Sequence, residues 1–290
     1  MPRLPAEPSP RRAEHLRRRL DSELVRRGLV SSRDRAQAEI AAGRVTVRGV
    51  PATKAARLVT LDDPLALQGP GPRFVSRGGD KLDAALDRFG VDPCGRVALD
   101  AGASTGGFTD CLLQRGAAQV VAVDVGRGQL DMRLRQDPRV SVRERTNVRN
   151  LTLADLGPAA EPFDLIVADL AFISLRTVAA ALLGLAAPGA DLVLLIKPQF
   201  EAGMAEASRE RGVIRDPSVW ADTVGAVLAT FAELGAPTKD LMVSPLTGAE
   251  GNVEYLAHLV AGAAGDERHA RQLVQAAVDE AVARRPRQEA

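Results

Sequence analysis

The sequence predicts an α/β protein with a mainly parallel, doubly wound sheet, preceded by a small α+β domain. Four short apolar runs alternate with helix-like segments in the later part of the chain, at residues 97–100, 120–124, 163–169 and 191–197. Such alternation is typical of parallel strands joined by helices that cover both faces of a sheet. Before residue 64, two short helical patterns precede short strand patterns, which indicates a separate small domain.

Shifts in composition divide the chain into five segments. A stretch rich in proline and glycine predicts a linker after the small domain. The last residues have helical spacing, and no function follows from them. The expected boundaries are 1–14 for a disordered tail, 15–63 for the small domain, 64–75 for the linker, 76–265 for the large domain and 266–290 for a C-terminal helical tail.

The small domain is predicted to contain two helices followed by a small sheet. Leu20 and Leu24 lie on one face of the first helix, and Gly28 suits its C-terminal end. A second helix with serine at its N-terminus follows. Alternation over residues 45–50 predicts a strand and a turn, and we expect the apolar run 58–61 to complete the sheet.

Charge is unevenly distributed along the 290 residues, although the formal net charge is only +1. Residues 1–60 carry 14 Arg or Lys against 6 Asp or Glu, whereas the rest of the chain carries 24 against 31. A basic module beside a mildly acidic body is typical of binding to a phosphate backbone. Two cysteines imply no disulfide framework, and we expect a cytoplasmic protein without a signal peptide or membrane span.

A glycine-rich turn follows the first apolar run of the large domain. It reads Asp-Ala-Gly-Ala-Ser-Thr-Gly-Gly-Phe over residues 100–108, and a helix-like stretch comes next. Glycines let the backbone approach a ligand, and a helix N-terminus offers free N–H groups. Asp124 ends the second apolar run, where an acidic residue suits a ribose hydroxyl. The turn predicts a nucleotide-type ligand, and an ordinary strand-to-helix turn is the alternative.

This turn lacks the spaced G-x-G-x-x-G of dinucleotide enzymes and resembles the first motif of S-adenosylmethionine-dependent methyltransferases. We therefore expect this cofactor, with Asp124 at its ribose and Asn147 at its adenine. The expected cofactor residues are Asp100, Gly102, Ser104, Thr105, Gly106, Gly107, Phe108, Asp124 and Asn147.

Two further polar residues end apolar runs, and ligands bind beyond the carboxyl ends of strands in doubly wound sheets. Asp169 follows one run and Lys197 follows another. The residues after Asp169 differ from the Asn/Asp-Pro-Pro-Tyr that is usual in enzymes methylating exocyclic amines, and neither cysteine lies near this strand end. With methylation of exocyclic amines and of pyrimidine carbon disfavoured, methylation of oxygen remains. A lysine can act as a base toward a ribose 2′-hydroxyl. The alternative is an ordinary strand-end lysine that reaches water.

Seven segments together resemble the TlyA-type ribosomal RNA 2′-O-methyltransferases, a family also named hemolysins, with an FtsJ-like catalytic domain. They are residues 75–82, 99–109, 123–130, 144–147, 168–175, 196–201 and 251–255. The resemblance implies a catalytic tetrad at Lys81, Asp169, Lys197 and Glu254. It implies that Lys197 is the base or orienter at the hydroxyl, that Asp169 holds this lysine, and that the other two position the ribose. Spacing alone finds neither Lys81 nor Glu254.

The small domain resembles the RNA-binding fold first described in ribosomal protein S-four, through Arg19-Leu20-Asp21, Ser32-Arg33 and residues 43–47. The resemblance implies ribosomal RNA or ribosomal subunits as partner. We expect neither a membrane nor a metal as partner. The arginines implied to face RNA are Arg18, Arg19, Arg33, Arg35 and Arg44, each of which could also be solvated surface. The alternatives are methylation of another RNA, a membrane-active hemolysin, and a non-catalytic RNA-binding protein.

Overall fold

The structure is a computed structural model that describes residues 17–30, 33–69, 71–202, 212–248 and 251–285. Contacts divide the chain into two compact units, Met1–Pro72 and Arg73–Ala290. The segment expected to be a disordered tail, residues 1–14, lies outside the described residues.

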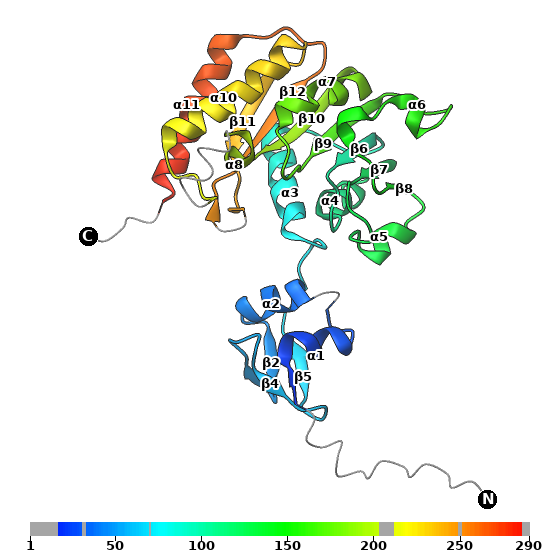
Figure 1. Cartoon of the computed structure of the whole chain (residues 1–290), viewed down its shortest axis with the longest axis vertical. Helices are drawn as coiled ribbons and strands as arrows, with labels where there is room; N and C mark the ends of the chain where they lie inside the picture. Colours follow the sequence, from blue (N-terminus) through cyan, green and yellow to red (C-terminus); the bar gives the residue numbers. More distant parts are fainter. Residues whose placement is uncertain (1–16, 31–32, 70, 203–211, 249–250, 286–290) are drawn as a thin grey trace, which may run out of the picture. The chain divides into compact units, whose positions relative to one another are not determined.

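The small unit packs two helices against short strands around one apolar core (Figure 1). Leu20, Leu24 and Ile40 from the helices meet Val45 and Val47 from a strand, and all five are buried. The apolar spacing of the two helices therefore faces this core, as the sequence predicts. The elements are β1 (Arg18–Arg19), α1 (Leu20–Arg26), α2 (Arg33–Ala41), β2 (Val45–Val47), β3 (Val50–Pro51), β4 (Leu58–Val59) and β5 (Leu65–Leu67).

Strand pairing in the small unit differs from the expectation. The run 58–61 does not complete the sheet of β2, because β4 pairs with β1 instead. Residues 65–67, expected in the linker, form β5, which pairs antiparallel with β2. Strands of two or three residues carry too little alternation to specify a partner, so the pattern could not choose between these pairings.

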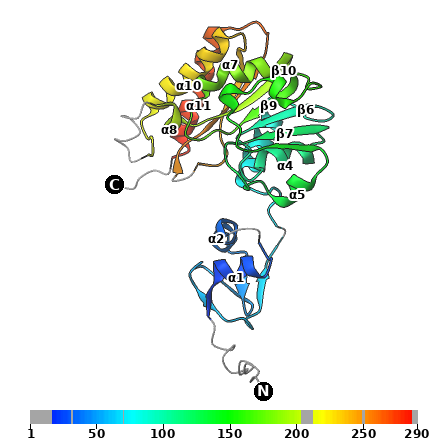
Figure 2. The same ribbon diagram turned by 45° about the vertical axis from the view of Figure 1, so that its right-hand side comes forward.

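The large unit has a seven-stranded sheet between helices, so the predicted fold class is confirmed (Figure 2). The strand order is β11-β12-β10-β9-β6-β7-β8. β12 runs antiparallel to both of its neighbours, and the other pairs of the central sheet are parallel. The strands are β6 (Val97–Ala101), β7 (Gln119–Val123), β8 (Val140–Arg143), β9 (Phe163–Ala168), β10 (Ala186–Ile196), β11 (Thr238–Val243) and β12 (Tyr255–Val260).

The order of the strands locates the ligand crevice. The chain runs outward from β6 through β7 to β8, then returns to β9 on the other side of β6. At such a reversal the two connections leave the sheet in opposite directions, which opens a crevice beyond the carboxyl ends of the two central strands. The turn after β6 and the residues after β9 therefore meet at the expected binding place.

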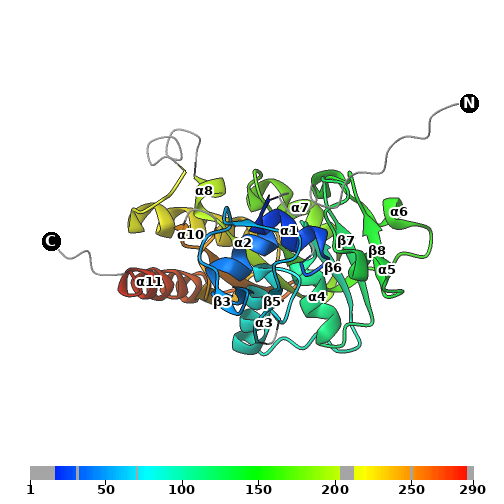
Figure 3. The same ribbon diagram turned by 90° about the horizontal axis from the view of Figure 1, so that it is seen from below.

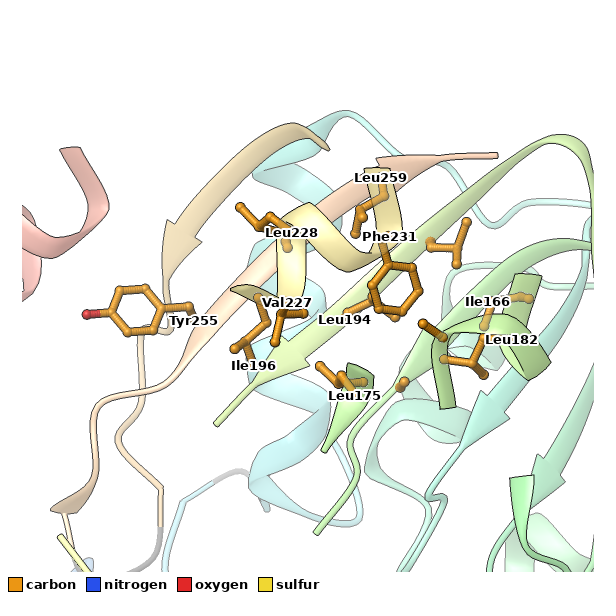
Figure 4. Close-up of a cluster of buried hydrophobic side chains, with 14 of the residues drawn as sticks. Ile166, Leu175, Leu182, Leu194, Ile196, Val227, Leu228, Phe231, Tyr255 and Leu259 are labelled. Atoms are coloured by element: carbon orange, nitrogen blue, oxygen red, sulfur yellow. The ribbon is translucent and has the colours of Figure 1, made fainter. Parts of the chain in front are cut away.

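Helices cover both faces of this sheet and enclose two apolar cores. On one face, Leu182 and Phe231 pack over the strand residues Ile166 and Leu194 (Figure 4). On the other face α3 and α4 lie side by side (Figure 3). Burial on both faces explains why the parallel strands are almost entirely apolar. The helices are α3 (Arg77–Phe89), α4 (Gly107–Gln114), α5 (Met132–Gln136), η2 (Val148–Asn150), α6 (Leu153–Leu156), α7 (Leu175–Leu185), α8 (Pro198–Glu201), α10 (Pro217–Glu233) and α11 (Glu267–Ala283).

The C-terminal helix α11 belongs to the core of the large unit. Val274, Ala277, Val278 and Ala281 are buried and join the same cluster as α7 and α10. The helical spacing at the end of the sequence thus marks a packed helix, whereas we expected a tail beyond the large domain.

Candidate active site

The glycine turn after β6 packs closely against its own protein. Gly102 has φ +89°, and a Cβ there would lie 2.4 Å from the backbone oxygen of Asp169. A Cβ on Gly107 would lie 2.3 Å from Ser76 Oγ. Gly106 has φ +98° and would press into a leucine of α5. Internal packing therefore requires glycine at all three positions, independently of any ligand.

A cavity of about 290 Å³ lies beside this turn. Its lining includes three residues of the expected tetrad and five expected cofactor residues: Lys81, Asp169, Lys197, Gly102, Ser104, Thr105, Gly107 and Phe108. Gly106 precedes α4 and supplies no side-chain cap to the helix. Gly107 and Phe108, the first two residues of α4, line the cavity, so the positive N-terminal end of this helix faces it.

Two ion pairs between lysine and carboxylate join the four expected tetrad residues two by two, and three of the four line the cavity. Lys197 Nζ pairs with Asp169 Oδ1, and Lys81 Nζ pairs with Glu254 Oε2. The side chains of Lys81 and Glu254 are only 9% and 3% exposed, against 13% and 24% for Lys197 and Asp169. The pair of Lys81 and Glu254 is thus buried in the protein, whereas the pair of Lys197 and Asp169 lies closer to solvent, at the ends of two adjacent strands.

Asp100 lies at the end of β6 and is fully buried. Its Oδ2 accepts a hydrogen bond of 2.6 Å from Thr109 Oγ1, and its Oδ1 has no partner among the described residues. Burial raises the pKa of Asp100 to about 7, against the opposing effect of the Thr109 hydrogen bond. Asp100 is absent from the lining of the 290 Å³ cavity, so its carboxylate makes no direct contact with a ligand bound there.

Asp124 and Asn147 both bind backbone N–H groups with their side-chain oxygens. Asp124 accepts from the amides of Ser104 at 2.8 Å and Gly126 at 2.6 Å. Asn147 caps η2 by accepting from the amide of Arg149 at 3.0 Å. Neither residue lines the 290 Å³ cavity, and Asp124 lines a smaller pocket beside it with Ser104. Their contacts with a cofactor stay predictions.

Residues at the start of α3 also line the cavity, and strand-end reasoning missed their contribution. Ser76, Arg77 and Gly78 lie there, opposite Gly107 of the glycine turn. They precede the first strand of the sheet, so no rule about strand ends reaches them. The adjacent glycines at positions 78 and 79 are the available signal, because a Cβ on Gly79 would lie 2.3 Å from the ring of Phe74 and a side chain does not fit there.

Two buried carboxylates, Asp21 and Glu39, hold four of the five arginines that were expected to face RNA. The pairs are Arg19 with Asp21 at 2.8 Å, Arg33 with Asp21 at 3.1 Å, Arg35 with Glu39 at 2.9 Å and Arg44 with Glu39 at 2.6 Å. Arg18 is exposed on β1. The side chains of Arg19 and Arg33 are 46% and 56% exposed, so each keeps an open side while its guanidinium is fixed.

Comparison with known proteins identifies both units. An FtsJ-like methyltransferase model matches residues 74–261, and an S4 domain model matches residues 18–65. The chain is 51% identical over 240 residues to the 16S/23S rRNA (cytidine-2'-O)-methyltransferase TlyA of Mycobacterium tuberculosis, covering 82% of this chain and 88% of that one. It is 38% identical over 243 residues to Hemolysin A of Brachyspira hyodysenteriae, covering 83% and 99%.

A solved structure from Streptococcus thermophilus, of a protein that carries a hemolysin name, aligns with a TM-score of 0.72 at 35% identity, covering 92% of this chain and 98% of that one. The resemblance drawn from the sequence motifs is thereby confirmed for both units. This chain belongs to the FtsJ-like methyltransferase family and, within it, to the TlyA group, which carries an S4 domain before the methyltransferase domain.

Proposed function

We propose that this protein transfers a methyl group to the ribose 2′-oxygen of cytidines in ribosomal RNA. One observation carries the proposal: two lysine–carboxylate pairs adjoin the glycine turn of a methyltransferase fold. The Mycobacterium tuberculosis relative, identical at 51% of aligned positions, is named for this reaction.

The methyl donor in this proposal is S-adenosylmethionine, which supplies an electrophilic methyl group on a sulfonium. The residues present fit such a ligand, because the uncapped N-terminus of α4 suits its carboxylate. Two backbone amides fix the Asp124 carboxylate, which makes it a preorganised acceptor for ribose hydroxyls. Gly102, Ser104, Thr105, Gly106, Gly107 and Phe108 would surround the methionine end, and Asn147 would contact the adenine. Asp100 would act on the cofactor only indirectly, because it is fully buried behind the glycine turn.

Each tetrad residue has a role that follows from its place. The Lys197 amine reaches the cavity from the end of β10 and would orient or deprotonate the 2′-hydroxyl. Asp169 fixes that amine through the ion pair. The buried pair of Lys81 and Glu254 would hold the ribose from the side of α3. Alignment of the hydroxyl with the methyl group supplies most of the rate enhancement in such a site.

The small unit would bind ribosomal RNA through its arginines. Guanidinium groups that are already fixed by buried acids lose little conformational freedom when a phosphate binds to their open side. Contacts to phosphates give affinity without sequence specificity, so selection of the nucleotide would rest with the large unit and the shape of the RNA. The partner in this proposal is a ribosomal subunit, met in the cytoplasm.

The hemolysin names of some relatives raise a second function, lysis of membranes, which no feature of the described residues favours. Among the described residues, no helix is both long and apolar enough to cross a membrane.

The described part of the chain contains no group of three or more His, Cys, Asp or Glu side chains placed to hold a metal ion.

The proposal is tested by methyl transfer to isolated subunits. Small and large ribosomal subunits from a strain that lacks this protein are incubated with the protein and with cofactor labelled on its methyl group. We expect label in a dinucleotide that resists alkali, because a 2′-O-methyl group blocks hydrolysis of the adjacent phosphodiester. Label on a base, or no label on either subunit while the cofactor binds, would contradict the proposal.

A further inference from the structure

We propose that Glu201 is a positioning residue for methyl transfer, because it ties the connection that carries Asp169 to the segment that carries Lys197. The inference rests on the proposed function, in which these two residues act at the 2′-hydroxyl. Glu201 itself is absent from the lining of the cavity.

Asp169 and Lys197 belong to different connections. Asp169 begins the connection from β9 to α7, and Lys197 follows β10 and precedes α8, which ends at Glu201. The Glu201 carboxylate accepts hydrogen bonds from the amide of Leu175 at 2.8 Å and from Ser174 Oγ at 2.5 Å. One side chain on the Lys197 side thus fixes the end of the connection that starts at Asp169.

The connection that Glu201 fixes is strained. Phe172 has φ +65°, a conformation that a bulky residue rarely adopts, and the residue is 91% exposed. Such backbone persists only where its surroundings hold it in place. The ring of Phe172 lies 5.2 Å from that of Phe200, the residue directly before Glu201. Two contacts therefore join the same two segments, one aromatic and one through the carboxylate.

The hydrogen bonds at the start of α7 also explain why a carboxylate occupies position 201. Ser174 Oγ accepts from the amide of Arg176, and Glu201 accepts from the amide of Leu175, so both groups serve the start of α7. These amides have no partner within the helix, and a negative charge at a helix N-terminus is favourable. Burial raises the pKa of Glu201, against the opposing effect of its two hydrogen bonds. The positive charge of Arg176 also opposes this rise, although no lysine or arginine side chain is hydrogen-bonded to the carboxylate within the described residues.

The test compares carboxylates that cap two different helices. Glu201→Ala removes both hydrogen bonds, Glu201→Gln keeps one acceptor oxygen, and Ser174→Ala removes one donor. Asp216→Ala is the matched control, because Asp216 caps α10 through the amide and hydroxyl of Ser218, both at 2.8 Å, and is absent from the cavity lining. For each full-length variant, kcat and KM are measured on ribosomal subunits, with cofactor affinity by calorimetry and thermal unfolding in parallel.

We expect Glu201→Ala to lower kcat by about 10- to 100-fold, the usual effect of a small misplacement of reacting groups. KM for the subunit and the affinity for the cofactor are expected to stay within about twofold, because neither binding surface is touched. Glu201→Gln and Ser174→Ala should fall between Glu201→Ala and the wild type. Asp216→Ala should lose thermal stability like Glu201→Ala but keep its kcat.

Two results would overturn the inference while the proposed function stands. One is a wild-type kcat in Glu201→Ala, and the other is an equal loss of kcat in Asp216→Ala, which would mean that stability alone is responsible. If the wild-type protein fails to methylate either subunit, the proposed function falls and the positioning role falls with it.

Discussion

Buried carboxylates meet opposite surroundings in the two units. In the small unit, the Arg19 guanidinium holds the pKa of Asp21 well below its usual range, and Arg26 lowers that of Glu23 to about 2. At the carboxyl edge of the large sheet, Asp100 accepts a hydrogen bond from the Thr109 hydroxyl and pairs with no cation among the described residues, and burial raises its pKa to about 7. A buried acid that an arginine neutralises avoids the cost of an isolated buried charge, whereas an unpaired buried acid is costly and is typical of a functional site. The comparison separates buried acids that a cation neutralises from a buried acid that has no cation beside it among the described residues.

The largest effect is expected from breaking the buried pair in the large unit. Lys81→Met would leave Glu254 buried without a cation, which costs about 3–5 kcal/mol of unfolding free energy. Urea unfolding followed by the fluorescence of Trp220, the single tryptophan of the chain, measures this loss. The double variant Lys81→Met with Glu254→Gln should recover most of the stability but no activity. A single variant as stable as the wild type would contradict the view that this pair is part of the core.

The next effect concerns pH and the large unit. Because the pKa of Asp100 rises from 3.8 to about 7 on folding, the folded state holds a proton that the unfolded state loses. The contribution to stability is therefore full below pH 4 and is lost as pH rises to 7, by at most about 4 kcal/mol. Asp100→Asn should flatten this slope in urea unfolding between pH 4 and 7, although Glu201 adds a smaller slope of the same sign. Identical slopes in both proteins would remove Asp100 from the comparison.

The strand-end logic of parallel sheets predicted much of the site. Because the carboxyl ends of β6, β9 and β10 meet at one edge, the glycine turn, Asp169 and Lys197 had to come together. Lys81 and Glu254 lie before the first strand and before an antiparallel strand, 173 positions apart. No spacing rule connects such positions, so only the family resemblance could name them.

In the small unit, local rules predicted the helices but missed most charge pairing. Leu20 and Leu24 marked the buried face of α1, and Gly28 with φ +69° follows its end. The pairing of Arg35 with Glu39 is readable from their spacing of four residues on a helix. The pairing of Arg33 with Asp21 joins two helices, so it required the tertiary structure.

The smallest effect belongs to the small unit and has the opposite pH sign. The lowered pKa of Asp21 gives stability that is present above pH 4 and is lost as pH falls through the folded pKa. Asp21→Asn should cost about 1–2 kcal/mol near pH 7, a modest loss because the partner arginines can hydrate. Hydrogen exchange at the Leu24 amide measures it, and affinity for subunits should fall as Arg19 and Arg33 lose their support. Asp62→Asn, at an exposed acid of the same unit, makes the same charge change and should leave both unaffected.

The central claim is that the Lys197 amine acts at the ribose hydroxyl, and one measurement tests it most directly. Single-turnover methyl transfer to ribosomal subunits is compared for the wild type and Lys197→Ala, with cofactor affinity determined on the same samples. The account predicts a rate at least about 100-fold lower in the variant, as expected for loss of a general base or orienting group. Cofactor affinity should stay within about twofold of the wild type. Transfer at the wild-type rate by Lys197→Ala would contradict the account.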